Sequence, residues 1–182
     1  MKKIGKTGTL LLCCCLAFSA LSVWAEEPGA APAKPPENEN GMPLMLDFTL
    51  SAADGGEVTL SDFEGRQVVL YFWATWCPAC VQGMPDKQAL HEWMLENEFP
   101  GEVWAVNLID GIRETRETCD AFIERNGLTM PVLYEETGEL SAWLGITAIP
   151  ATVVVDAEGY IKGGALGSWP LEEIIALLER DM

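Results

Sequence analysis

Residues 71–80, YFWATWCPAC, join an apolar run to a pair of cysteines, Cys77 and Cys80. The run starts at Gln67 and is rich in β-branched and aromatic residues up to Trp73, as expected of a strand that is covered on both faces. The residues after the cysteines have the pattern of a helix. The sequence therefore predicts a central strand that ends where a helix begins, with two thiols at the junction.

The spacing of the two cysteines predicts redox chemistry. Cys77 falls at the expected start of the helix, where unpaired backbone N–H groups and the helix dipole favour an anion. Such settings lower a thiol pKa from about 8.5 to roughly 3.5–7.5, so Cys77 is expected to be a nucleophile near neutral pH. Cys80 lies on the same helix face, where the two Cα atoms can come within the disulfide range of about 4.4–6.8 Å. Pro78 fits because a proline in the first turn loses no hydrogen bond.

A structural disulfide and a metal site are the other interpretations of this pair. A disulfide across so short a loop stabilises little, because the entropy gain grows with loop length. A zinc site needs four ligands, and Cys119 and the single histidine, His91, do not have finger-like spacing. We therefore expect neither a metal nor another cofactor at Cys77 and Cys80.

The composition predicts one soluble, acidic domain. The chain has 182 residues, of which 49% are hydrophobic, enough to form a packed core. Its formal net charge is −17, which opposes binding to nucleic acid and to anionic lipid. Eight of the 11 Lys and Arg residues and all 28 Asp and Glu residues follow residue 25, so the chain beyond it carries a net charge of −20. Neutral or basic proteins are the partners that fit this charge.

The N-terminal part predicts export. Residues 1–25 place three lysines before an apolar run at 10–23, and a small-residue cleavage site, VWA, follows at 23–25. An uncleaved membrane anchor is the alternative, although the run is shorter than the ~18 apolar residues of a spanning helix. The three cysteines in this run are not expected to be lipidated, because none follows the small residue that a lipoprotein cleavage site requires. Residues 26–43 predict a flexible linker rich in Pro, Ala and Glu, and residues 44–182 the folded domain.

Strands and helices alternate along the domain. Residues 45–50 and 57–60 flank a turn at 53–56 and predict a hairpin. The helix after the cysteines is expected to continue to residue 98, with a kink at Pro85. The remaining periodic segments predict strands at 103–108, 129–135, 151–156 and 160–166, and helices at 114–126, at 138–144 and after Pro170. This order predicts an α/β domain with helices on both faces of one sheet.

Two segments resemble the TlpA/ResA-like branch of the thioredoxin superfamily. Residues 60–80, LSDFEGRQVVLYFWATWCPAC, resemble its active-site region, and residues 145–161, GITAIPATVVVDAEGYI, resemble its cis-proline strand and hairpin. The resemblance covers residues 44–182 and implies a thioredoxin-like fold: a central mixed sheet flanked by helices, with an N-terminal β-hairpin and an inserted helix-strand unit. It also implies an exported, often membrane-tethered protein that reduces disulfides of extracytoplasmic proteins, including apocytochromes c, with electrons from a membrane thiol donor.

The resemblance also assigns roles to residues. Cys77 resembles the nucleophile and Cys80 the resolving thiol of a redox-active disulfide. Trp76 resembles the aromatic residue beside the active site, and Ile149 and Pro150 resemble the cis peptide that faces the disulfide, since X-Pro is the bond where the cis form is least costly. Substrate contact is expected at four residues: Trp76, Pro78, Ile149 and Pro150.

The chain departs from the family pattern at two positions. Many relatives have a glutamate three residues after the second cysteine, where this chain has Gly83. The buried aspartate of ordinary thioredoxins, six residues before the first cysteine, is Tyr71 here. These departures leave open which group takes the proton of Cys80, and Glu135 and Asp156 are the candidates.

Residues outside the motif have simpler interpretations. Cys119 shares an i, i+3, i+4 stripe with Phe122 and Ile123, which predicts a buried core thiol. His91 lies among charged residues and is expected to be a solvated surface residue without a catalytic role. Four tryptophans are expected in the core: Trp73, Trp93, Trp104 and Trp143.

The function predicted from all these features is that of an exported thiol-disulfide oxidoreductase acting mainly as a reductant, with disulfide-containing exported proteins as substrates. A dithiol protein acting as an oxidant is one alternative, because the residues between the cysteines do not fix the reduction potential. A thioredoxin-like copper-binding chaperone is another, since an exported Cys-X-X-Cys can hold Cu(I), although no histidine follows His91. The motif does not fit a peroxidase, whose cysteine usually follows Pro-x-x-x-Thr-x-x.

Overall fold

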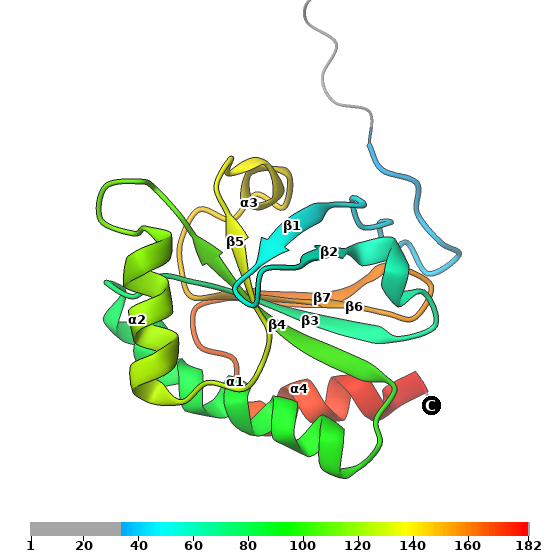
Figure 1. The fold of residues 1–182 in the computed structure, drawn as a ribbon. Helices are drawn as coiled ribbons and strands as arrows, with labels where there is room; N and C mark the ends of the chain where they lie inside the picture. The colour runs from blue at the N-terminus through cyan, green and yellow to red at the C-terminus, as the bar shows by residue number, and fades with distance from the viewer. Residues whose placement is uncertain (1–33, 182) are drawn as a thin grey trace, which may run out of the picture. The chain divides into compact units, whose positions relative to one another are not determined.

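The computed structural model describes residues 34–181 (Figure 1). The predicted export signal or anchor at 1–25 and the first part of the predicted linker lie outside the described residues. Within residues 34–181, no helix is both long enough and apolar enough to cross a membrane.

The centre of the fold is a seven-stranded mixed sheet in the order β2-β1-β5-β4-β3-β6-β7 (Figure 1). Strands β3, β4 and β5 are parallel, while β6, β7 and the β1–β2 hairpin run antiparallel to their neighbours. The strands are β1 (Thr49–Ala52), β2 (Glu57–Thr59), β3 (Gln67–Trp73), β4 (Gly101–Leu108), β5 (Val132–Glu135), β6 (Ala151–Val155) and β7 (Ile161–Leu166).

Strand β3 has the bounds that its apolar run predicts, and every residue in it is buried. It pairs with β4 on one side and with β6 on the other, so both of its edges and both of its faces are covered. A continuous run of β-branched and aromatic residues suits such a position, because neither face meets water. Strand β3 is therefore a rigid support for the residues that follow it.

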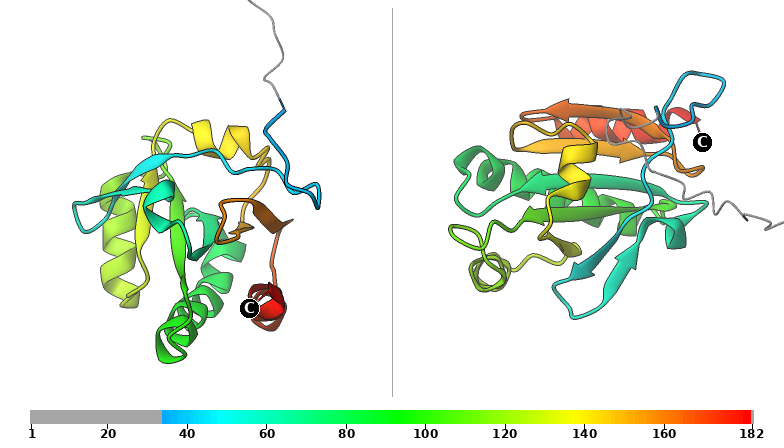
Figure 2. Two further views of the ribbon diagram at one scale, coloured as in Figure 1. Left: turned by 90° about the vertical axis from the view of Figure 1, so that its right-hand side faces the viewer. Right: turned by 90° about the horizontal axis from the view of Figure 1, so that it is seen from above.

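Helices cover both faces of the sheet, as predicted (Figure 2). Helices α1, α2 and α4 pack on one face, where Trp73 and Cys119 belong to the same buried cluster. Helix α3 and the 3-10 helix η1 pack on the other face with Leu70 and Trp104. The helices are η1 (Leu60–Phe63), α1 (Pro78–Glu96), α2 (Arg116–Asn126), α3 (Glu139–Trp143), α4 (Leu171–Leu178) and the 3-10 helix η2 (Glu179–Asp181).

The first predicted strand, 45–50, is largely wrong. Strand β1 begins only at Thr49, although its hairpin with β2 is present as predicted. Met45 and Phe48 are buried without joining the sheet, because the Met45 backbone N–H donates to the carbonyl of Gly159 and the Phe48 carbonyl accepts from the Leu60 backbone N–H. Alternating apolar residues can therefore fill the core from an irregular segment that only resembles a strand.

Residues 34–43, whose composition predicts a linker, lie against the domain (Figure 1). The backbone N–H of Leu44 donates to the carbonyl of Pro36, and the N–H of Ile161 in β7 donates to the carbonyl of Pro43. Leu44 also forms a β-bridge with Tyr160. This part of the chain is therefore hydrogen-bonded to the last hairpin, which differs from the extended segment expected.

Candidate active site

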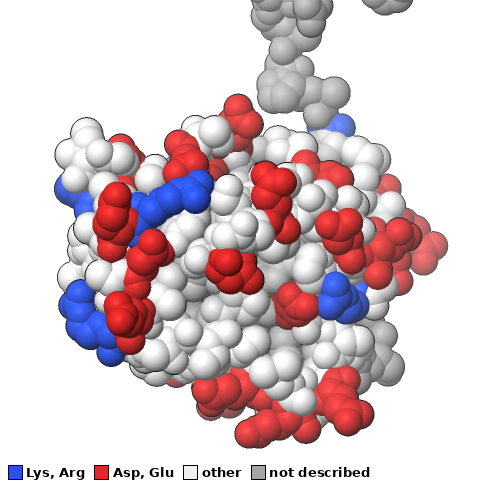
Figure 3. Space-filling model, in the orientation of Figure 1, with Lys and Arg blue, Asp and Glu red and all other residues white. Residues whose placement is uncertain are grey.

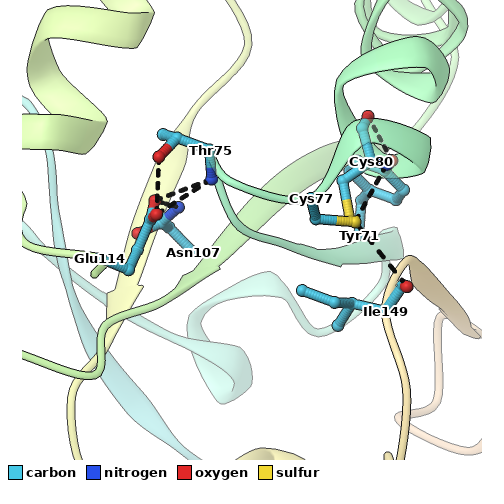
Figure 4. The surroundings of a disulfide bond; sticks show 7 residues. All are labelled: Tyr71, Thr75, Cys77, Cys80, Asn107, Glu114 and Ile149. Carbon is cyan, nitrogen blue, oxygen red and sulfur yellow. Dashed lines mark hydrogen bonds between the residues drawn. A yellow bond between two sulfur atoms is a disulfide. The ribbon is translucent and has the colours of Figure 1, made fainter. Parts of the chain in front are cut away.

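A disulfide joins Cys77 and Cys80 at the start of α1 (Figure 4). The two Cα atoms are 5.2 Å apart, within the range expected from the spacing. Cys77 is the N-cap residue of α1, and its Sγ accepts a hydrogen bond of 3.2 Å from the backbone N–H of Cys80. Pro78 occupies the first turn, as predicted, and the helix continues through Pro85 to Glu96. The first sulfur therefore lies where the helix presents unpaired N–H donors.

The second predicted motif meets the first in space. The Ile149–Pro150 peptide bond is cis. The carbonyl oxygen of Ile149 lies 3.8 Å from Cys77 Sγ, and the next residue, Pro150, is buried. Residues that are 72 positions apart in sequence thus form one site (Figure 4).

Trp76 stands at the surface beside Cys77, with 44% of its area exposed. The guanidinium carbon of Arg113 lies 4.1 Å from the centre of its ring, a cation–π arrangement. Arg113 comes from the segment between β4 and α2, and its side chain also pairs with Asp110 at 3.5 Å. The exposure of Trp76 is compatible with the substrate contact expected of it, whereas no pattern in the sequence indicates the arginine.

Tyr71 and Gly83, the two positions at which the chain departs from the family pattern, lie next to each other in the structure. The Tyr71 hydroxyl donates a 2.8 Å hydrogen bond to the carbonyl of Cys80 (Figure 4). A Cβ atom on Gly83 would lie only 2.9 Å from that hydroxyl oxygen. The Tyr71 hydroxyl therefore occupies the space that a side chain at position 83 would need. Burial raises the pKa of Tyr71, so the hydroxyl stays protonated.

Lys87 is a buried cation on the face of α1 that also carries Cys80. Its Nζ donates to the carbonyl of Trp169 at 3.1 Å and lies 5.4 Å from the centre of the Tyr71 ring. Burial lowers the pKa of Lys87, and the nearby charge of Asp86 opposes this shift. Lys87 is not among the predicted site residues, although its position seven residues after Cys80 places both on one helix face.

Glu114 is a buried acid that contacts the segment between β3 and Cys77. The sequence pattern predicts that it lies inside the helix at 114–126. Helix α2 begins two residues later, at Arg116, because Thr115 is its N-cap. The side chain of Glu114 is completely buried and accepts hydrogen bonds from Thr75 and Asn107 (Figure 4). The capping threonine was the sequence signal that would have placed Glu114 outside the helix.

Neither acid suggested for the proton of Cys80 lies at the cysteines. Glu135 ends β5, and its Oε1 accepts a 2.8 Å hydrogen bond from the backbone N–H of Ser141 in α3, on the sheet face opposite α1. Asp156 follows β6 at the end of the sheet where β3 begins, since Val155 pairs with Val68. Its Oδ1 accepts from the backbone N–H of Tyr160. Both candidates are therefore wrong, because strand position alone did not reveal the face or the edge.

Three predictions concern residues outside the motif. Cys119 is a free thiol in the core, as predicted, and burial, followed by the charges of Glu114 and Asp120, raises its pKa. His91 is half-buried and not fully solvated, and burial lowers its pKa while two glutamates oppose this. Trp143, the last residue of α3, is 36% exposed, so the prediction that it lies in the core is wrong.

Residues 34–181 contain no group of three or more His, Cys, Asp or Glu side chains that could hold a metal ion.

A mixed sheet with helices on both faces, and a disulfide at the helix that follows a central strand, define the class: a thioredoxin-like protein with a redox dithiol. The AhpC/TSA family model matches residues 43–163. The chain therefore belongs to the AhpC/TSA family, and it is a thiol-disulfide oxidoreductase of the ResA/StoA type with Cys77 and Cys80 as its Cys-X-X-Cys pair.

Individual relatives agree with this assignment and confirm the resemblance inferred from the two motifs. The thiol-disulfide oxidoreductase ResA of Geobacillus thermodenitrificans is 32% identical over 133 residues, 73% of each chain. The crystal structure of StoA from Bacillus subtilis superposes with a TM-score of 0.65 at 24% identity, covering 74% of this chain and 97% of that one. The exposed lipoprotein thioredoxin of Streptococcus pneumoniae has a TM-score of 0.67 at 26% identity, covering 74% and 99%.

Proposed function

We propose that this protein is an extracytoplasmic protein-disulfide reductase in which Cys77 attacks and Cys80 resolves. The supporting observation is the different placement of the two sulfurs. Cys77 caps α1 next to the exposed Trp76 and the carbonyl of Ile149 and keeps 5% of its area exposed, whereas Cys80 keeps none. The first sulfur is therefore the one that we propose a partner's disulfide meets, while the second meets only its neighbour.

The reaction has two exchange steps. The Cys77 thiolate attacks one sulfur of a partner's disulfide, which forms a mixed disulfide and releases the partner's other sulfur as a thiolate. The Cys80 thiol gives up its proton and attacks Cys77 Sγ, which closes the Cys77–Cys80 disulfide and releases the second partner sulfur. Two electrons pass to the partner, and the protein then needs a dithiol donor to return to its reduced form.

The surface around Cys77 supports a polypeptide substrate. Trp76, Pro78, Ile149 and Pro150 are the residues that we propose to contact it. Trp76 offers a flat, partly exposed ring that Arg113 holds in place, and such rings supply contact area at little cost in conformational entropy.

The location outside the cytoplasm rests on two observations. Residues 1–25 have the pattern of an export signal or anchor. A similar solved structure is that of a pneumococcal lipoprotein described as exposed. We therefore propose disulfides of exported proteins as the substrates, apocytochrome c among those to be tested, and a membrane thiol protein as the electron donor, with a membrane tether as a further part of the proposal.

Trapping of the mixed disulfide tests the assignment of the two cysteines. Cys80→Ser, expressed in a bacterial host with its export signal, should accumulate disulfide-linked complexes that reductant dissolves, because no second thiol releases the partner. Cys77→Ser is the matched control and should trap none. Equal trapping by both variants, or none by either while Cys77 remains open to alkylation, would contradict the proposed roles.

The reduction potential tests the direction of electron flow. Potentials of such proteins range from about −270 mV for thioredoxin to about −120 mV for a strong oxidant, and a reductase should lie toward the lower value. Equilibration of the pure protein with glutathione redox buffers, followed by alkylation and mass spectrometry, measures this potential. A value near the upper end of the range would reject the reductase and favour the oxidant alternative.

A further inference from the structure

We propose that Glu114 is a positioning residue for the redox pair: its carboxylate fastens the segment between β3 and Cys77 to strand β4, and thereby holds Cys77 where it closes a disulfide with Cys80. Glu114 acts through Thr75 and not on a sulfur atom. This inference deepens the proposed function and depends on the roles proposed there for Cys77 and Cys80.

The side chain of Glu114 only accepts hydrogen bonds. The backbone N–H of Thr75 lies 3.0 Å from both carboxylate oxygens, and the Thr75 hydroxyl donates to Oε2 at 2.7 Å. The amide Nδ2 of Asn107 donates to Oε1 at 2.7 Å. An ionised carboxylate accepts without donating and has lone pairs for all three donors, which a glutamine amide lacks. The site is thus built for an acidic side chain.

The position of these partners explains what the carboxylate holds. Asn107 is in β4 directly beside Trp73, the last residue of β3. Thr75 lies in the short connection from β3 to Cys77, where the Cys77 backbone N–H also donates to the carbonyl of Ala74 at 3.2 Å. Glu114 therefore joins the carboxyl ends of two parallel strands at the point where the cysteine loop leaves the sheet (Figure 4).

The backbone on both sides of Glu114 is itself fixed. Before it, Asp110 Oδ1 accepts three backbone N–H groups, at 2.7–2.9 Å, from Ile112, Arg113 and Glu114. The Glu114 carbonyl in turn accepts from the backbone N–H groups of Asp110 and Gly111. After it, Thr115 caps helix α2. A side chain held between a closed turn and a capped helix can transmit its own fixed position to Thr75.

Loss of Glu114 acts through Thr75, because its carboxylate oxygens accept from the backbone N–H and the hydroxyl of that residue. A looser Thr75 segment makes the meeting of the two sulfurs less favourable, which disfavours the disulfide relative to the dithiol. The pair should therefore become a stronger oxidant.

Glu135 is a matched control within the same chain. It is also a buried glutamate at the carboxyl end of a parallel strand, and it also accepts from a backbone N–H and a hydroxyl, both of Ser141. It lies on the opposite face of the sheet and contacts α3. Its loss should therefore cost stability without reaching the cysteines.

The experiment compares Glu114→Ala, Glu114→Gln, Thr75→Val and Glu135→Ala with the unmodified full chain. The equilibrium constant for oxidation by glutathione disulfide is measured for each, together with the urea midpoint. For Glu114→Ala we expect this constant to fall by about tenfold or more, equal to about 30 mV, and for Glu114→Gln by a smaller factor in the same direction. Thr75→Val, which keeps the backbone donor, should also shift it, while Glu135→Ala should lower the urea midpoint and leave the constant within about twofold.

Constants within about twofold of the unmodified chain for both Glu114 variants would overturn the inference, as would an equal shift for Glu135→Ala. If Glu114→Ala does not fold, Glu114→Gln and Thr75→Val decide the outcome. Failure of the proposed function looks different, because the unmodified chain would then show no reversible Cys77–Cys80 disulfide with glutathione.

Discussion

Tyr71 and Gly83 have to be considered together, because the tyrosine hydroxyl occupies the space that a side chain at position 83 would need. Only a residue without a Cβ allows the hydroxyl to reach the carbonyl of Cys80 at 2.8 Å. Glycine inside a helix costs about 1 kcal/mol relative to alanine, so its presence in α1 has to be offset by this contact. The two positions that carry acids in relatives and in ordinary thioredoxins thus share one neutral hydrogen bond to the Cys80 carbonyl here.

The first prediction is that the effect of Gly83→Ala on the free energy of unfolding changes sign when Tyr71 is replaced by phenylalanine. In the natural background, Gly83→Ala should lower the free energy of unfolding by about 1–3 kcal/mol, because the new Cβ meets the Tyr71 hydroxyl. In a Tyr71→Phe background, the nearest ring atom is 3.8 Å away, and the same change should stabilise by about 1 kcal/mol. Urea unfolding of the four oxidised proteins measures both values. The same sign in both backgrounds would show that the hydroxyl does not limit position 83.

The second prediction concerns Cys119 at alkaline pH. Burial raises its pKa in the folded state, so the folded protein keeps this proton while the unfolded chain loses it above about pH 8.5. The stabilisation is fully present below the unfolded pKa and is lost as pH rises above it. From pH 7.5 to pH 9.5 the natural protein should therefore lose about 1.4 kcal/mol that Cys119→Ala does not lose.

The difference between these two proteins is the quantity to measure, by urea unfolding with the Cys77–Cys80 disulfide intact. Other groups, such as Lys87, titrate equally in both and cancel. A difference that stays constant over this pH range would mean that Cys119 ionises in the folded protein and is not a buried core thiol.

At the residue scale, local motifs predicted what local chemistry determines. Cys77, Cys80 and Trp76 could be placed from their neighbours alone, because strand, turn and helix start are encoded within ten positions of the motif quoted from residues 71–80. Glu114 and Lys87 could not, because their roles depend on which face and which strand end they meet. Long-range packing decides that, and a single sequence does not contain it.

At the scale of elements, helix α2 shows how one residue sets a boundary. The Thr115 Oγ1 accepts from the backbone N–H of Thr118, and the Thr118 hydroxyl accepts from the backbone N–H of Thr115. This reciprocal cap ends the preceding turn and starts the helix at Arg116. The predicted start at residue 114 ignored the cap and so hid the buried acid.

The third prediction follows from this cap. Thr115→Ala should lower the free energy of unfolding by about 1 kcal/mol, because the first turn of α2 loses one partner for its N–H groups, while Thr115→Ser should restore most of it. The reduction potential should change much less than in Glu114→Ala, since the Glu114 carboxylate keeps its hydrogen bonds to Thr75 and Asn107. Denaturant unfolding and glutathione equilibration of the same samples test both parts. A shift in potential as large as that of Glu114→Ala would place α2, and not the carboxylate, in control of the loop.

Strand predictions succeeded where burial is uniform. Strand β3 was predicted residue by residue, because both faces are buried and a continuous apolar run has one interpretation at this length. The strand prediction around Met45 failed because alternating apolar residues have two interpretations. They can form a half-buried strand, or an irregular segment that places alternate side chains in the core. Backbone pairing separates these possibilities, and it depends on which partner edge is available.

At the scale of the whole molecule, charge is the dominant surface property. The chain has 28 acidic residues and only 11 Lys and Arg, so most carboxylates have no cation to pair with. Four ion pairs join residues within 34–181, and acidic side chains spread over the face seen in Figure 3. Any charged partner must therefore approach through a negative potential, which salt weakens.

The fourth prediction uses small disulfides of different charge. Oxidation of the reduced protein by anionic glutathione disulfide should become about threefold faster or more between 10 mM and 500 mM salt, because screening removes the repulsion. Cationic cystamine should become slower by a similar factor, because screening removes its accumulation near the surface. Stopped-flow measurement of tryptophan fluorescence, with Trp76 beside the reacting sulfur, follows both reactions.

Neutral hydroxyethyl disulfide is the control, and its rate should not respond to salt beyond the general effect on thiol exchange. A common response of all three reagents would mean that salt acts on the Cys77 thiolate itself, because a change in its pKa alters every rate in the same direction. Opposite responses of the anionic and cationic reagents would instead locate the effect in the approach to the site. That result would favour neutral or basic protein segments as substrates, since the net charge of −17 disfavours acidic ones before any contact forms.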